Sequence, residues 1–174
     1  MKTFSPQKGF TLIESLIALS LAAFVFVAMI HFTINLIQIK TKTRVISEVA
    51  ANGRLVQDVL TDAARHATGI VSDLSLFGES PGILALSMVS EEEDPTIFAV
   101  DEGVFRVQRG MTEFLSISTQ EVVVTNVLFT NLTSPDDIGI IQVQFTLQAL
   151  NDSGNPFFDY EESFQTVLRI PRGE

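Results

Sequence analysis

The first pattern along the chain is an apolar stretch that begins at Phe10 and continues to Ile39. Glu14 is the only formally charged residue in this stretch, and the polar residues are scattered Thr, Ser, His, Asn and Gln. A helix of about 20 apolar residues is long enough to span the hydrocarbon core of a bilayer. The pattern therefore predicts a membrane-spanning helix over residues 10–39, preceded by a short polar segment, residues 1–9.

Helical periodicity continues beyond this stretch, because apolar residues recur at spacings of three and four. These residues are Val45, Val49, Val56, Val59, Leu60, Ala63 and Ala67. No proline interrupts residues 10–80, Gly53 is the weak point for helix stability, and Gly69 is expected to end the helix. Residues 40–69 are thus predicted to form the amphipathic half of one long helix, with the apolar stripe covered by a domain.

From residue 71 onward the pattern changes to short apolar or alternating runs separated by turn residues. The runs that predict strands are 83–89, 96–100, 104–109, 114–118, 121–130, 140–147 and 164–170. Short strands with tight connections and no helices between them indicate an antiparallel sheet. The predicted fold class is α+β: a long N-terminal α-helix, membrane-spanning in its first half, packed on an antiparallel β-sheet domain over residues 70–174.

Composition excludes several function classes. A formal net charge of -10 argues against nucleic-acid binding, which needs clustered Lys and Arg. The absence of cysteine excludes disulfides and thiolate metal sites. The two histidines, His31 and His66, fall in the apolar stretch and near the predicted helix end, so a histidine-based catalytic site would have to be built from one of them. We therefore expect neither an enzyme nor a bound cofactor.

Acidic turn residues leave calcium as one alternative, because carboxylate oxygens are its preferred ligands. None of the acidic turns has the spacing of an EF-hand loop, and such turns are usually only solvated. The segments concerned are Glu91–Asp94, Asp136–Asp137 and Asn151–Asp159.

Glu14 stands out because a carboxylate inside a membrane helix costs about 2.5–3.5 kcal/mol near the bilayer centre and less toward the interface. Two interpretations are open from this residue alone. Glu14 lies at the membrane interface, where the start of a helix also favours a carboxylate, or it has a functional partner of opposite charge.

The residues around Glu14 carry a family resemblance. Lys8-Gly9-Phe10-Thr11-Leu12-Ile13-Glu14 resembles the cleavage motif of type IV prepilins and type II secretion pseudopilins. The resemblance implies that residues 1–9 are a leader, that a prepilin peptidase cuts between Gly9 and Phe10, and that Phe10 is then N-methylated. It also implies that Glu14 pairs with an N-terminal amine, in its own chain or a neighbour, and sets the register of subunits.

A more diffuse resemblance extends over the rest of the chain. The chain is similar to PilW-like minor pilins and to the J-type pseudopilin of type II secretion in two places. These are Asn52-Gly53-Arg54 and the C-terminal pattern Tyr160…Phe164…Leu168-Arg169. This implies a minor pilin-like subunit of a type IV pilus, competence pilus or type II secretion pseudopilus. Its partners would be other pilins and the prepilin peptidase.

The same resemblance implies a location in the bacterial inner membrane, with the N-terminus inside and the C-terminal domain outside. Charge alone does not settle this orientation, because Lys40, Lys42 and Arg44 follow the apolar stretch as Lys2 and Lys8 precede it. The alternative function is an uncleaved single-pass membrane protein whose outer domain binds a ligand. N-terminal sequencing distinguishes the two.

Overall fold

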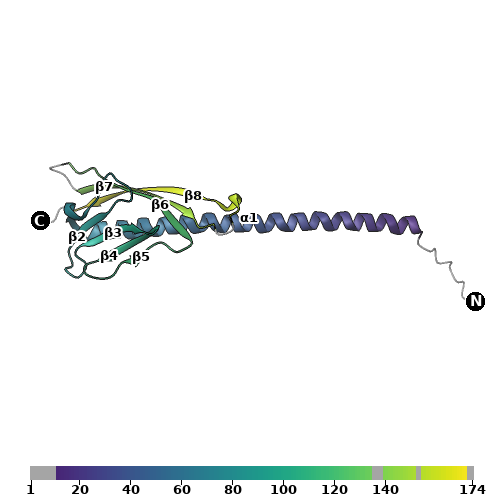
Figure 1. Cartoon of the computed structure of the whole chain (residues 1–174), viewed down its shortest axis with the longest axis horizontal. Coiled ribbons are helices and arrows are strands. Elements are labelled where there is room, and N and C mark those ends of the chain that lie inside the picture. Colours follow the sequence, from purple (N-terminus) through teal and green to yellow (C-terminus); the bar gives the residue numbers. More distant parts are fainter. Residues whose placement is uncertain (1–10, 135–138, 152–153, 172–174) are drawn as a thin grey trace, which may run out of the picture. The chain divides into compact units, whose positions relative to one another are not determined.

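A computed structural model describes residues 11–134, 139–151 and 154–171 (Figure 1). Helix α1 (Leu12–His66) is followed by strands packed in antiparallel sheets, which confirms the predicted α+β architecture. The strands are β1 (Ala67–Ile70), β2 (Leu84–Met88), β3 (Thr96–Asp101), β4 (Val104–Arg109), β5 (Leu115–Ser116), β6 (Val122–Asn131), β7 (Gly139–Ala149) and β8 (Glu161–Ile170). Two short 3-10 helices, η1 (Ser72–Leu74) and η2 (Pro156–Phe158), lie in the loops. The contacts divide the chain into two units, Met1–Thr41 and Lys42–Glu174.

In the first unit, α1 is exposed along its whole described length. Leu12, for example, is 82% exposed, and by length and composition the helix is apolar enough to cross a membrane. Its hydroxyl groups are satisfied inside the helix: Ser20 donates to the Ile17 carbonyl and Thr33 to the Met29 carbonyl, both at 2.9 Å. Internal satisfaction of this kind suits a membrane anchor, because the hydrocarbon core offers no other hydrogen-bond partners.

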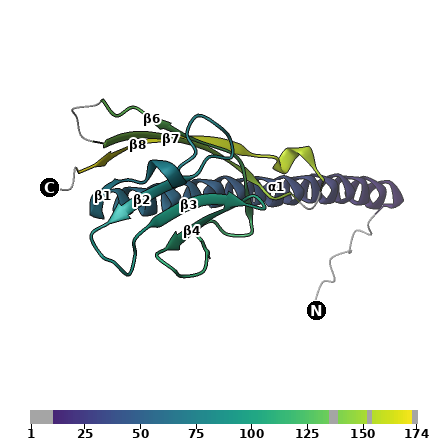
Figure 2. The ribbon, with the colours of Figure 1, turned by 60° about the vertical axis from the view of Figure 1, so that its left-hand side comes forward.

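In the second unit, the strands form two antiparallel sheets. The five-stranded sheet has the order β1-β2-β3-β4-β5, and the three-stranded sheet has the order β6-β7-β8. The ladder between β7 and β8 runs from Gly139↔Ile170 to Gln148↔Glu161. Within this unit α1 lies between the two sheets (Figures 1 and 2).

The core forms where the stripe of α1 meets the inner faces of both sheets. Its largest fully buried side chains from the strands are Phe98, Phe105, Phe129 and Phe145. From α1 the same cluster takes Val49, Val56, Leu60, Ala63 and Ala64. Since full burial of a Val, Leu or Phe side chain contributes about 1.5–3 kcal/mol, this shared cluster holds α1 against both sheets.

The end of α1 differs from the sequence-based expectation. The helix ends at His66 rather than Gly69, and Ala67–Ile70 form β1. Strand β1 pairs with β2 through Ala67↔Met88 and Ile70↔Leu86. Backbone pairing with β2, together with burial of Ala67, outweighs the local helical period at these residues.

Candidate functional site

The start of α1 is fixed by Thr11. The predicted processing residues Gly9 and Phe10 lie outside the described residues, so the described chain begins directly after them. The Thr11 hydroxyl accepts a hydrogen bond from the Glu14 backbone N–H at 3.3 Å, and the Thr11 carbonyl accepts from the backbone N–H of Ser15 at 3.1 Å. The Glu14 N–H also donates to the Thr11 carbonyl at 3.1 Å, so Thr11 caps the helix with both its side-chain and its backbone oxygen.

Glu14 lies in the first turn of α1, with its side chain turned back toward the cap. Its Oε2 accepts a hydrogen bond from the Thr11 hydroxyl at 3.5 Å, and no cation of the described residues lies within 4 Å of it. A Thr-x-x-Glu spacing at a helix start is that of a capping box. The carboxylate is therefore exposed at the positive end of the helix dipole, where it can accept an ammonium group. We did not single out Thr11 from the sequence, although this spacing was the available signal.

Asn52 connects α1 to the segment between β5 and β6. Its side chain is 3% exposed. Its Oδ1 accepts a hydrogen bond from the Thr119 backbone N–H, and its Nδ2 donates to the Glu48 carbonyl, both at 2.9 Å. Each half of the buried amide has a partner, as buried polar groups require.

Gly53 lies on α1 directly against the Phe164 ring of β8. A Cβ atom at Gly53 would overlap the Phe164 ring and lie 2.6 Å from its Cε2. The Phe164 ring stacks on Phe145 with ring centroids 5.2 Å apart, and the Gln57 side chain donates to the Gln165 carbonyl at 3.3 Å. The Asn52-Gly53 and Phe164 features of the sequence therefore meet in one junction between the helix and the three-stranded sheet.

The C-terminal residues of the same pattern have different surroundings. Leu168 is buried in the core, whereas Tyr160 is half-buried and donates a hydrogen bond to Glu162 at 3.3 Å. Desolvation, together with the neighbouring Glu162 carboxylate, raises the pKa of Tyr160 above its usual value near 10. The tyrosine is therefore neutral throughout the physiological range and acts as a hydrogen-bond donor.

Two carboxylates of the acidic turns, Asp94 and Asp159, accept internal hydrogen bonds. The Asp94 carboxylate accepts from the Met88 backbone N–H at 2.9 Å and from the Ser87 hydroxyl at 3.1 Å. The Asp159 carboxylate accepts from the Asn151 side chain at 2.7 Å. Within the described ranges, no group of three or more His, Asp or Glu side chains is arranged to hold a metal ion. Asp136, Asp137 and Asp152 lie outside these ranges.

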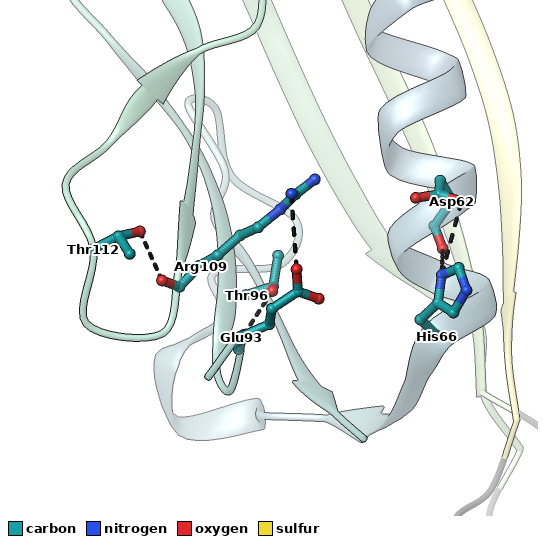
Figure 3. A network of polar contacts seen from close by, with 6 residues as sticks. All are labelled: Asp62, His66, Glu93, Thr96, Arg109 and Thr112. Atoms are coloured by element: carbon teal, nitrogen blue, oxygen red, sulfur yellow. Dashed lines mark hydrogen bonds and ion pairs between the residues drawn. The ribbon is translucent and has the colours of Figure 1, made fainter. Parts of the chain in front are cut away.

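Both histidines lie on α1. His31 lies on the exposed apolar part of α1. His66 Nδ1 lies 2.9 Å from the Asp62 carbonyl and 3.8 Å from the Asp62 carboxylate. This pair lines a cleft between the end of α1 and β4 (Figure 3).

Comparison with known proteins gives one match. A family model described as the prokaryotic N-terminal methylation motif, a type IV prepilin-like motif, matches residues 4–30. The match covers the capped start of α1 and Glu14, and the helix-on-sheets architecture is pilin-like. The motif supports a type IV pilin-like protein of the pilin and pseudopilin family. No curated protein and no solved structure matches the chain.

Proposed function

We propose that the chain is a pilin-like structural subunit, cut by a prepilin peptidase between Gly9 and Phe10, methylated on Phe10 and assembled through α1 into a filament. One observation carries this proposal. The methylation motif at residues 4–30 coincides with the capped start of an exposed apolar helix in which Glu14 is the single carboxylate before Glu48.

The chemistry of the cut explains why Glu14 is present. Cleavage creates an ammonium group at Phe10, a second charge that is costly in an apolar setting. Opposite charges attract strongly where water is excluded, so Glu14 compensates this ammonium, in its own chain or in a neighbour. Thr11 supports this role because its hydroxyl turns the carboxylate toward the end of the helix where the amine forms. Pairing with a neighbour's amine would set the axial register of each incoming subunit.

The proposed location and partners follow from the same role. The subunit is held in the bacterial inner membrane with its N-terminus inside and the sheet domain outside. Its partners are other pilins and the prepilin peptidase, and its role is structural rather than enzymatic. The proposed machine is a type IV pilus, a competence pilus or a type II secretion pseudopilus. The Asn52-Gly53 junction with Phe164 is the feature that favours a PilW-like minor pilin or a J-type pseudopilin.

Processing is tested by expressing the chain with and without a prepilin peptidase and measuring the intact mass and the N-terminal peptide. We expect loss of residues 1–9 and one methyl group on Phe10 only when the peptidase is present. Gly9→Val is the control, because a side chain before the cut should block cleavage while the membrane helix stays unchanged. A full-length, unmethylated chain under both conditions would contradict the proposal and favour an uncleaved single-pass binding protein.

A further inference from the structure

A cavity of about 300 Å³ lies where three segments of the sheet domain meet. The segments are the turn between β3 and β4, the middle of β6, and the segment that precedes β2. Four of the lining residues are polar: Ser80, Glu102, Thr125 and Asn126. The volume is at the lower end of the range of small-ligand pockets, so the cavity can hold a small group.

Hydrogen bonds between the three segments fix the walls of the cavity. The Val124 N–H donates to the Gly103 carbonyl at 2.7 Å and joins β6 to the turn. The Gly82 N–H donates to the Val127 carbonyl at 3.0 Å, and the Val127 N–H donates to the Ser80 hydroxyl at 3.4 Å. The walls come from both sheets and are joined through the backbone. A ligand therefore enters a preformed site, which lowers the entropic cost of binding.

Two irregularities of the backbone occur at this cavity. The register of β6 against β7 shifts between Val124 and Asn126, so that Thr125 is the extra residue of a β-bulge. Bulges redirect side chains and are frequent beside functional sites. Glu102 has a φ of 50°, in the left-handed region that residues other than glycine seldom adopt. A tight hairpin turn of this kind prefers asparagine at such a position, and strained residues cluster where ligands bind.

The polar groups of the cavity include two that the fold leaves without a partner. The Glu102 carboxylate and the Asn126 amide form no hydrogen bond or ion pair with another described residue. Among the described residues that line the cavity there is no Lys, Arg or aromatic side chain. An anion or a stacked ring therefore finds no matching group there. One carboxylate is also too few for a calcium ion, which takes six to eight oxygen ligands.

An aliphatic wall accompanies these acceptors. Pro81 and Val100 line the same cavity, and Val100 is half-buried. A carboxylate together with an aliphatic wall matches an ammonium group on a flexible hydrocarbon stem, as in a lysine side chain. The ammonium has three donors, which the carboxylate and the Asn126 carbonyl can accept.

We propose that this cavity binds a primary alkylammonium group, with the ammonium at Glu102 and Asn126 and the stem against Pro81 and Val100. The group is the lysine side chain of another protein or a free aliphatic amine. The formal net charge of -10 favours a cationic ligand, because it raises the local concentration of cations. The inference does not rest on the proposed function, because every residue involved lies in the sheet domain.

Binding is measured by amide NMR shifts of the full chain in detergent, with pentane-1,5-diamine as the probe. We expect saturable shifts at Gly103, Val124 and Val127. Pentane-1,5-diol has the same stem without the charge, and methylamine has the charge without the stem. Each should bind at least tenfold more weakly than the diamine, a difference of about 1.4 kcal/mol. Equal affinity for the diamine and either control ligand overturns the inference.

The role of the carboxylate is tested by Glu102→Gln, which removes the charge and keeps the side-chain length. This variant should bind the diamine at least tenfold more weakly. Glu121→Gln is the matched control, because Glu121 is also exposed but does not line the cavity. Glu102→Asn suits the turn better, so it should lose binding without loss of folding stability. Unchanged affinity in Glu102→Gln and Glu102→Asn overturns the inference.

The source of the ammonium group is identified with a carbodiimide, which joins a carboxylate to an adjacent primary amine. Cells that produce the tagged chain are treated, and peptides of the purified chain are analysed by mass spectrometry. Glu102 joined to a lysine of another protein identifies a protein partner, and Glu102 carrying a small amine identifies a free amine. Amide formation at Glu102 no more frequent than at Glu121 overturns the inference. Cleavage and methylation at Phe10 are read from the same peptides, so the proposed function is judged separately.

Discussion

The substitution Gly53→Ala should have two opposing effects on the stability of the domain, one from helix propensity and one from packing. In an exposed helix, replacing Gly by Ala stabilises by up to about 1 kcal/mol. In this chain the added Cβ would overlap the Phe164 ring, which is held in place by stacking on Phe145. Overpacking of a filled core costs about 1–3 kcal/mol, and losing an aromatic pair costs about 0.5–1.5 kcal/mol. We therefore expect a net destabilisation of about 1–3 kcal/mol.

The assay is urea unfolding of the full chain in detergent, followed by far-ultraviolet circular dichroism and by protease resistance of the sheet domain. Phe164→Leu shortens the side chain that meets Gly53, so the double variant should be less destabilised than the sum of the single variants by at least about 1 kcal/mol. Ala51→Gly, at an exposed position of the same helix turn, reports helix propensity alone. A Gly53→Ala chain as stable as the unmodified chain, or more stable, would refute this account of the junction.

Three further predictions concern the junction and the start of the helix. Asn52→Ala should destabilise the domain by about 1–3 kcal/mol, because it leaves the Thr119 N–H without its acceptor; an unchanged urea midpoint would contradict this. Glu14→Ala should leave cleavage intact but lower recovery in filaments roughly tenfold, as expected for the loss of about 1.4 kcal/mol of charge pairing, whereas Ser20→Ala on the same helix should have no effect. Equal recovery of the two variants would argue against a register role. Thr11→Val should weaken the helix start by about 1 kcal/mol and Thr11→Ser should not, measured as amide hydrogen exchange in the first turn; equal exchange in both variants would count against the cap.

Much of the fold follows from local patterns in the sequence. The long helix was predictable because an unbroken apolar run continues into a stripe of period 3.6, and Val49, Val56 and Leu60 of that stripe are buried as expected. The strands were predictable where apolar and polar residues alternate, as in β7. At the helix start, Glu14 was recognisable as the one charged residue of the apolar stretch. The Thr-x-x-Glu spacing also predicts the helix cap at Thr11.

The remaining features depend on residues that are far apart in the chain. Strand β1 continues the helical period of α1, and only its pairing with β2 makes it a strand. From the sequence alone, Gly53 is only a position that weakens the helix. The structure shows that Phe164, from the last strand, packs against it. The division into two sheets likewise depends on which strands pair, because short alternating runs do not encode the choice of partner. The cleft at Asp62 and Glu93 joins the end of a helix to a turn, and no sequence spacing predicts this proximity.

The central claim is that the mature chain is a filament subunit, and peptide mass spectrometry of purified, sheared filaments tests it most directly. The account predicts an N-terminal peptide that begins at methylated Phe10 in the filament fraction, and loss of the chain from that fraction in Glu14→Ala. Recovery of the chain only in the membrane fraction, with residues 1–9 still attached, would contradict it.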